Sequence, residues 1–314
     1  MKGIIWILLI QLFVACVQLK NNESQSQLTF KVEIEDLSEL DKTVEILQKR
    51  LTSFCSNAEI NQYGNSKILE IKLPGTSDTT LFTKLITTKA KFQILETFEN
   101  RDLINNLQKI NALMLDMDLA DSVKNDSLSN NYPFFKILLP MVDQNGIVSP
   151  GPGLGTSSAN DTQQVKEVLS TTAVKTALPN DFIPVWGNSF YGNDYFTLYA
   201  VKKSNQQRII SNFMVEETSV SESTNNSYAV NILFKNKYHK DWGKLTENNI
   251  SRALAIVFDH YVYSAPQVMA KISGGKSQIA GNFNELEANL LATFIGSGFL
   301  TSKLTIKSIK HTSQ

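Results

Sequence analysis

The sequence predicts an α+β fold, and two kinds of hydrophobic spacing predict it. Alternating apolar and polar residues mark strands near both ends of the 314-residue chain, while other segments place apolar residues at helical spacing. A packed core is expected, since 42% of the residues are hydrophobic and 19% are charged. Thirty basic side chains balance thirty acidic ones. This balance argues against a nucleic-acid partner, because nucleic-acid binders carry an excess of Lys and Arg.

The start of the chain, residues 1–15, is predicted to be a secretory signal peptide. Lys2 precedes a run over 4–14 that is apolar except for Gln11 and too short to cross a bilayer core, and the small residue Ala15 follows it. An uncleaved anchor or plain secretion would also account for this segment. Residues 16–27 are polar and lack periodicity, as expected for a tether.

Residues 28–100 predict the first half of a base with the order β-α-β-β-α-β, the split pattern of ferredoxin-like folds. Strands are expected where apolar side chains alternate or cluster, and helices where they recur three or four residues apart. The expected strands are 28–34, 59–63, 68–73 and 91–98, and the expected helices are 40–51 and 80–87.

Residues 212–314 repeat this mixture and are assigned to the second half of the same base. The expected strands are 228–234, 253–258, 262–268, 277–280 and 304–309, and the expected helices are 238–252 and 283–295. Two copies of one unit would produce this order, and so would one sheet built from both ends of the chain. The polar residues 218–227 lack helix caps and are expected to be mobile.

Residues 101–211 are expected to form an α+β head inserted into the base. The expected helices are 101–124 and 163–172, the expected strands are 182–185 and 196–201, and 142–161 is expected to be a loop rich in Gly, Pro and Ser. The GPGLG sequence at 151–155 holds a proline that does not suit a dinucleotide-binding turn. We therefore expect a surface loop there that can contact a partner.

No pattern predicts a catalytic residue, a cofactor or a metal site. The SGGKS sequence at 273–277 lacks the first glycine of a phosphate-binding loop, because Ala270 stands there, so a turn is expected. Asp116, Asp118 and Asp121 lack the glycine and the final glutamate of a calcium loop, so a solvated helix face is expected.

Cysteine and histidine are equally uninformative about catalysis. Cys55 follows Leu51 and Phe54 at helical spacing and is expected in the packed core. The spacing of the three histidines nominates no partner for a thiol nucleophile. His260 with Asp259 is expected to form a turn between strands, and the protein is not expected to be an enzyme.

Four segments near the C-terminus resemble the periplasmic part of the SecD protein-export subunit. They are AIVFD at 255–259, VYSAP at 262–266, GGKSQIAGNF at 274–283 and the stretch at 287–300. Upstream, residues 44–78 and 87–96 are similar to further motifs of that family, so the resemblance extends over about 28–304. The family's transmembrane helices are not expected in this chain, and an ion-driven motor is therefore not expected either.

The resemblance implies a ferredoxin-like base, a movable head and an accessory role in protein export. The domain would bind unfolded or newly exported polypeptide, or dock on the Sec translocon. The aromatic residues considered for polypeptide contact are Phe134, Phe135, Trp186, Phe190 and Tyr191, with packed head core as the alternative. A second function stays open, an envelope scaffold lipoprotein that reuses the fold to bind a folded partner.

The sequence FVAC at 13–16 resembles a bacterial lipoprotein processing site. This resemblance implies a lipid on Cys16 and a periplasm-facing protein of the cell envelope. Val17, in place of an aspartate after the cysteine, favours the outer membrane over the inner one. No cofactor, metal ion or nucleic acid is implied as a partner.

Overall fold

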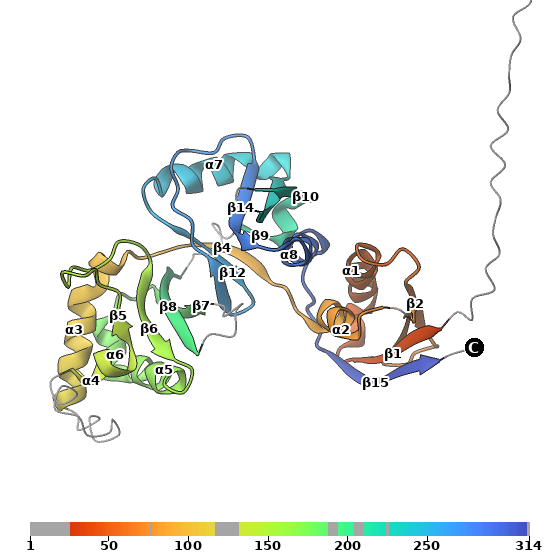
Figure 1. The fold of residues 1–314 in the computed structure, drawn as a ribbon, viewed down its shortest axis with the longest axis horizontal. Helices are drawn as coiled ribbons and strands as arrows, with labels where there is room; N and C mark the ends of the chain where they lie inside the picture. The colour runs from red at the N-terminus through yellow and green to blue at the C-terminus, as the bar shows by residue number, and fades with distance from the viewer. Residues whose placement is uncertain are drawn as a thin grey trace, which may run out of the picture.

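The computed structural model describes residues 26–75, 77–116, 132–187, 194–203, 210–223 and 226–312. These residues form a mixed α+β fold with three separate sheets, which confirms the predicted fold class. Figure 1 shows the sheet that contains β1 and β15 at one end of the molecule and helices α3–α6 at the other. The sheet that contains β10 and β14 lies between these two ends in this view.

The first sheet has the strand order β15-β1-β3-β2, with every neighbouring pair antiparallel. Its elements are β1 (Gln27–Ile34), α1 (Leu40–Thr52), β2 (Glu59–Gln62), β3 (Ile68–Pro74), α2 (Thr79–Thr87) and β15 (Leu304–Thr312). In β1, alternate side chains from Leu28 to Ile34 are fully buried, as a strand with one covered face requires. Phe30 pairs with Ile71 on one side and with Ile309 on the other, so both ends of the chain build this sheet.

The predicted strand at 91–98 does not complete this sheet. It forms β4 (Phe92–Glu96), which pairs with β12 (Leu254–Phe258) in a different sheet, and β15 takes the place beside β1. All five residues of β12 are buried. A strand buried on both faces needs hydrogen-bonded neighbours on both edges, and β4 is one of them.

The largest sheet has the order β5-β6-β8-β7-β13-β12-β4-β9. Its other strands are β5 (Leu139–Pro140), β6 (Gly153–Ser158), β7 (Phe182–Gly187), β8 (Tyr195–Lys202), β9 (Ile210–Ser211) and β13 (Tyr261–Ser264). Helices α3 (Asn100–Asp116), α4 (Pro133–Ile137), α5 (Thr162–Ser170) and α6 (Thr172–Ala177) build a second core against it. This one sheet joins strands from all three of the expected regions, 28–100, 101–211 and 212–314.

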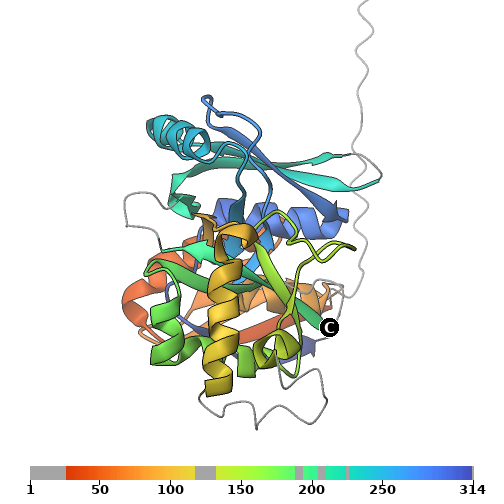
Figure 2. The same cartoon turned by 90° about the vertical axis from the view of Figure 1, so that its left-hand side faces the viewer.

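The third sheet has the order β10-β11-β14 and is covered on one face by α8, which Figure 2 shows beside the strands. Its elements are β10 (Val215–Glu222), β11 (Tyr228–Phe234), α7 (His239–Asn248), β14 (Lys276–Phe283) and α8 (Glu285–Ser297). The Asn284 side chain accepts a hydrogen bond from the N–H of Glu287, whose carboxylate accepts one from the N–H of Asn284, and this capping box begins α8.

Two segments that sequence reasoning expected to lack regular structure are strands. The polar run at 218–222 forms the greater part of β10. Backbone hydrogen bonds to the antiparallel strand β11 hold it as a strand, although its side chains are mostly polar. The GPGLG sequence leads into β6 and is mostly buried. A side chain on Gly155 would lie 2.5 Å from the carbonyl oxygen of Leu139, so the close approach of β5 explains this glycine.

Candidate functional site: polypeptide-contact surfaces

The aromatic residues predicted for polypeptide contact have very different surroundings. Phe134 is fully buried in the second core, and its N–H donates to Asn111 Oδ1 at 3.0 Å. It therefore offers no surface to a ligand. Phe135 and Trp186 are half-buried and pack against the same core. Phe190 and Tyr191 lie outside the described residues.

The half-buried Phe135 stacks on an exposed aromatic neighbour. Its ring stacks on Tyr132, with ring centroids 6.3 Å apart and an angle of 19° between the planes, and Tyr132 is 56% exposed. The sequence prediction passed over Tyr132, although it directly precedes Pro133 at the start of α4. This pair forms a partly exposed aromatic surface at the start of α4.

A second apolar surface lies on the hairpin 139–149. Leu139, Val142 and Ile147 are 51%, 45% and 64% exposed. Asp143 holds the turn, because its carboxylate accepts hydrogen bonds from the N–H groups of Asn145 and Ile147. Sequence reasoning placed partner contact at the neighbouring 151–155, which is mostly buried. The signal that marks the hairpin is the presence of a single charged residue, Asp143, between 137 and 160.

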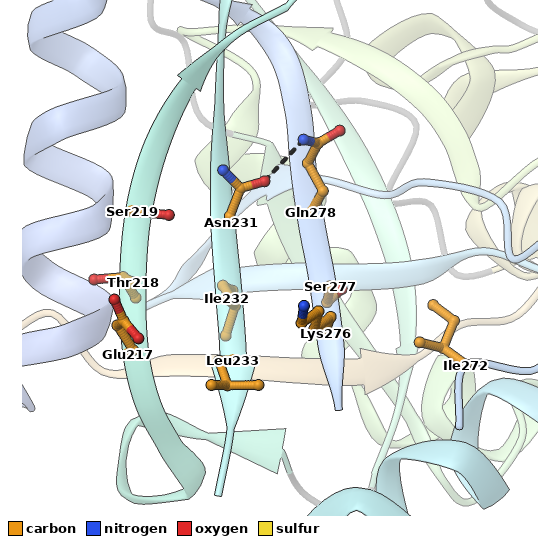
Figure 3. Close-up of a pocket in the computed structure, with 10 residues that line it drawn as sticks. All are labelled: Glu217, Thr218, Ser219, Asn231, Ile232, Leu233, Ile272, Lys276, Ser277 and Gln278. Atoms are coloured by element: carbon orange, nitrogen blue, oxygen red, sulfur yellow. Dashed lines mark hydrogen bonds between the residues drawn. The ribbon is translucent and has the colours of Figure 1, made fainter. Parts of the chain in front are cut away.

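The third sheet carries two hollows. One, of about 680 Å³, lies over the sheet face opposite α8 and includes Asn231 and Gln278, whose side chains are joined by a 2.8 Å hydrogen bond (Figure 3). The other, of about 570 Å³, lies between β10, α8 and the end of α1. Glu217, Thr218 and Ser219 of β10 line both hollows.

Arg50 is a fully buried charged residue with a structural role. Its guanidinium donates to Ser297 Oγ and to the carbonyl oxygens of Leu85, Thr88, Lys89 and Gly298, at distances between 2.6 and 3.2 Å. These five contacts use all the donors that a guanidinium has. Burial lowers the pKa of Arg50 to about 9, while the charge of Asp259 acts in the opposite direction. The side chain ties α1 to the ends of α2 and α8.

The remaining sequence candidates occupy turns or the core. Gly275 of SGGKS has φ +69° and accepts a hydrogen bond from Phe234 N–H in the turn before β14. Asp259 has φ +53° in the turn between β12 and β13, and its carboxylate accepts hydrogen bonds from Ala90 and Lys91 N–H. Cys55 is half-buried against the main core.

Several of the acidic and lipid-attachment candidates lie outside the described residues. Asp116 ends α3, whereas Asp118, Asp121 and Cys16 lie outside the described residues. Within the described ranges, no three His, Cys, Asp or Glu side chains lie close enough together to hold a metal ion. The same ranges contain no helix with the length and hydrophobicity needed to span a membrane.

A family model and curated relatives show which proteins the chain resembles. Residues 190–302 match the model described as the SecDF P1 head subdomain. Protein translocase subunit SecD of Rhodothermus marinus is 22% identical over 285 residues, which cover 85% of this chain. SecD of Rickettsia conorii is 33% identical over 134 residues, or 43% of the chain. This chain is similar to the large periplasmic domain of SecD.

The likeness to SecD extends to the fold. A crystal structure of SecDF in its super-membrane-facing form shares the fold with a TM-score of 0.50 at 17% identity, and the match covers 92% of this chain and 30% of that one. The chain spans 25% of the length of the Rickettsia SecD and 45% of the Rhodothermus SecD. The range that the SecDF head model matches, 190–302, overlaps the region that sequence reasoning assigned to the base.

Proposed function

We propose that this SecD-like domain is a non-enzymatic accessory of protein export that binds unfolded or newly exported polypeptide, or docks on the Sec translocon. The observation that carries the proposal is the similarity to SecD over 85% of the chain. That relative is named as a protein translocase subunit, and a domain similar to part of it is expected to meet the same class of client.

The surface of the domain supports this role. Unfolded chains expose apolar side chains, and a protein that holds them needs accessible apolar surface. Phe135 with Tyr132, Trp186, and the hairpin that presents Ile147 supply such surface. We propose Phe135 and Trp186, together with Phe190 and Tyr191, as the aromatic contacts.

Photocrosslinking in cells tests the proposal directly. A photoreactive amino acid at position 135, 147, 186 or 190 should capture many exported proteins, and the products should disappear when export is blocked. The exposed Lys109 on α3 is the control position, which should capture far less. A single folded partner that is captured regardless of export would contradict the proposal and support the envelope scaffold.

We further propose that Cys16 carries a lipid and that the domain faces the periplasm, at the outer membrane rather than the inner one. The support is the sequence FVAC before Val17. Radiolabelled palmitate should label the wild type but not Cys16→Ser, and the label should sediment with outer-membrane markers. Equal labelling of both proteins would contradict the lipid assignment.

A further inference from the structure

Strand β10 is an open edge of the third sheet. It pairs with β11 on one side, and the sheet has no strand on its other side among the residues that the structure describes. Ser223 N–H donates to the carbonyl oxygen of Ser227 at 2.8 Å, which makes these two residues a hydrogen-bonded pair. Hydrogen-bonded pairs alternate along an antiparallel ladder, so the backbone groups of Thr218, Val220 and Glu222 point outward.

The space on both sides of this edge is open. The hollow of about 680 Å³ adjoins β10 on the face opposite α8, and the hollow of about 570 Å³ adjoins it on the face toward α8 and α1. A strand added beside β10 would direct its side chains alternately to the two faces, and therefore into the two hollows. Ser219 and Asn231 line the first hollow, and Thr52 and Asn289 line the second.

The charges of β10 suit one class of occupant. Glu216 and Glu217 lie near its start and Glu222 at its end, all are exposed, and none forms an ion pair with a described residue. The four residues between them, 218–221, are uncharged. Glu217 and Glu222 are five residues apart, which is about 17 Å along a strand.

Another long edge strand of the molecule has the opposite charge. Strand β15, at the edge of the first sheet, carries Lys307 and Lys310 and no acidic residue. Lysines on an edge strand discourage pairing with a further strand. The uncharged centre of β10 has no such protection, and its acidic ends would attract basic residues rather than other acidic edges.

We infer that the β10 edge binds an extended segment of polypeptide by strand addition, and that it selects an uncharged run of four or five residues flanked by Lys or Arg. This inference rests on the proposed polypeptide-binding function and names the place, the binding mode and the preferred sequence class. Main-chain hydrogen bonds would supply affinity, and the acidic ends would supply selectivity.

Fluorescence anisotropy with synthetic peptides and the full chain tests the inference. The probe is a labelled, end-blocked peptide in which Lys flanks an alternating Val-Thr run, and it is compared with the same peptide flanked by Glu. The Lys peptide should bind at least tenfold more tightly, and the difference should shrink as salt is added. Equal affinity of the two peptides would overturn the inference.

Backbone methylation separates strand addition from simple charge attraction without altering the protein. Two versions of the Lys peptide carry N-methyl groups on alternate sets of amides, so that only one set meets β10. One version should bind at least tenfold more weakly than the parent, whereas the other should stay within about threefold. The same loss in both versions, or no loss in either, would contradict strand addition.

Protein variants locate the site. Reversing Glu216, Glu217 and Glu222 to Lys should exchange the preference, so that the Glu peptide binds more tightly. The matched control reverses Glu35, Glu59 and Glu167, which are exposed elsewhere on the molecule, and should keep the preference for Lys. An unchanged preference in the β10 variant would overturn the assignment to this edge, provided that its circular dichroism matches the wild type.

A permanently unfolded protein, such as a reduced and carboxymethylated globular protein, distinguishes the two proposals. If it binds the wild type while the peptides show no preference, the β10 inference fails and polypeptide binding stands. If neither the unfolded protein nor any peptide binds, both proposals fail. Binding of the unfolded protein that weakens at least threefold in the β10 variant, but not in the control, supports both.

Discussion

The guanidinium of Arg50, in the last turn of α1, lies over the ring of Phe294 of α8, 5.0 Å from its centroid. One face of the cation contacts the aromatic ring, and its five N–H groups donate hydrogen bonds to one hydroxyl and four backbone carbonyls. Arg50 thus joins the first sheet's helices to the helix that covers the third sheet.

Arg50→Met should lower the free energy of unfolding by about 3–5 kcal/mol, because it removes five buried charge-assisted hydrogen bonds, and of the four carbonyls Lys89 O keeps its bond from Leu300 N–H and Gly298 O its bond from Ser297 Oγ. Arg50→Lys should lose less, since an ammonium keeps the charge but offers three donors. Urea unfolding measures both variants. The neighbouring Lys49→Met is the control, because Lys49 is exposed, and it should change stability by less than about 1 kcal/mol. A loss of similar size in Lys49→Met would refute a special role for Arg50.

Gly155→Ala should lower the free energy of unfolding by about 1–3 kcal/mol, because the added carbon lies 2.5 Å from Leu139 O and would push β5 from β6. Gly274→Ala is the matched control, since nothing lies within 4 Å of a carbon added there. Thermal unfolding compares the two proteins. Equal thermal unfolding midpoints would show that β5 can move away from β6 at no cost, and that their close approach does not contribute to stability.

Asn284→Ala should cost about 0.5–2 kcal/mol, because it removes one half of the capping box that begins α8. Asn289→Ala, in the second turn of the same helix, keeps the cap and is the control. Hydrogen exchange should show faster opening of the first turn of α8 in the Asn284 variant. Unchanged exchange there would mean that packing on β10 and β11 alone holds this end of the helix.

The raised pKa of Tyr263 predicts a loss of stability at alkaline pH. Burial, with the charge of Asp259 as a smaller cause, raises its pKa from 10 to about 12. Between these values the unfolded state loses the phenolic proton that the folded state keeps, so the free energy of unfolding falls as pH rises from 10 to 12. Tyr263→Phe should make this fall shallower in urea unfolding at several pH values. Tyr261→Phe, an exposed neighbour, controls for hydroxyl loss, and identical slopes in wild type and Tyr263→Phe would disprove the assignment.

Local spacing by itself determined several elements of this protein. The alternation from Leu28 to Ile34 predicts β1, and the structure buries these alternate side chains together. The expected helix 40–51 is α1, in which Leu47 and Leu51 are buried, and the expected helix 283–295 is α8. These predictions succeed because the two faces of a strand and the apolar stripe of a helix depend on residues fewer than eight positions apart.

Only the tertiary structure decided which strands share a sheet and which residues stay accessible. Phe30 pairs with Ile309 rather than with a residue of β4, and Phe134 is core while its neighbour Phe135 reaches the surface. Backbone N–H and C=O groups are the same in nearly every residue, so the sequence of a strand does not determine which other strand it pairs with. That choice follows from how the buried faces of distant segments fit together, and the open edge of β10 is visible only once every strand has its place.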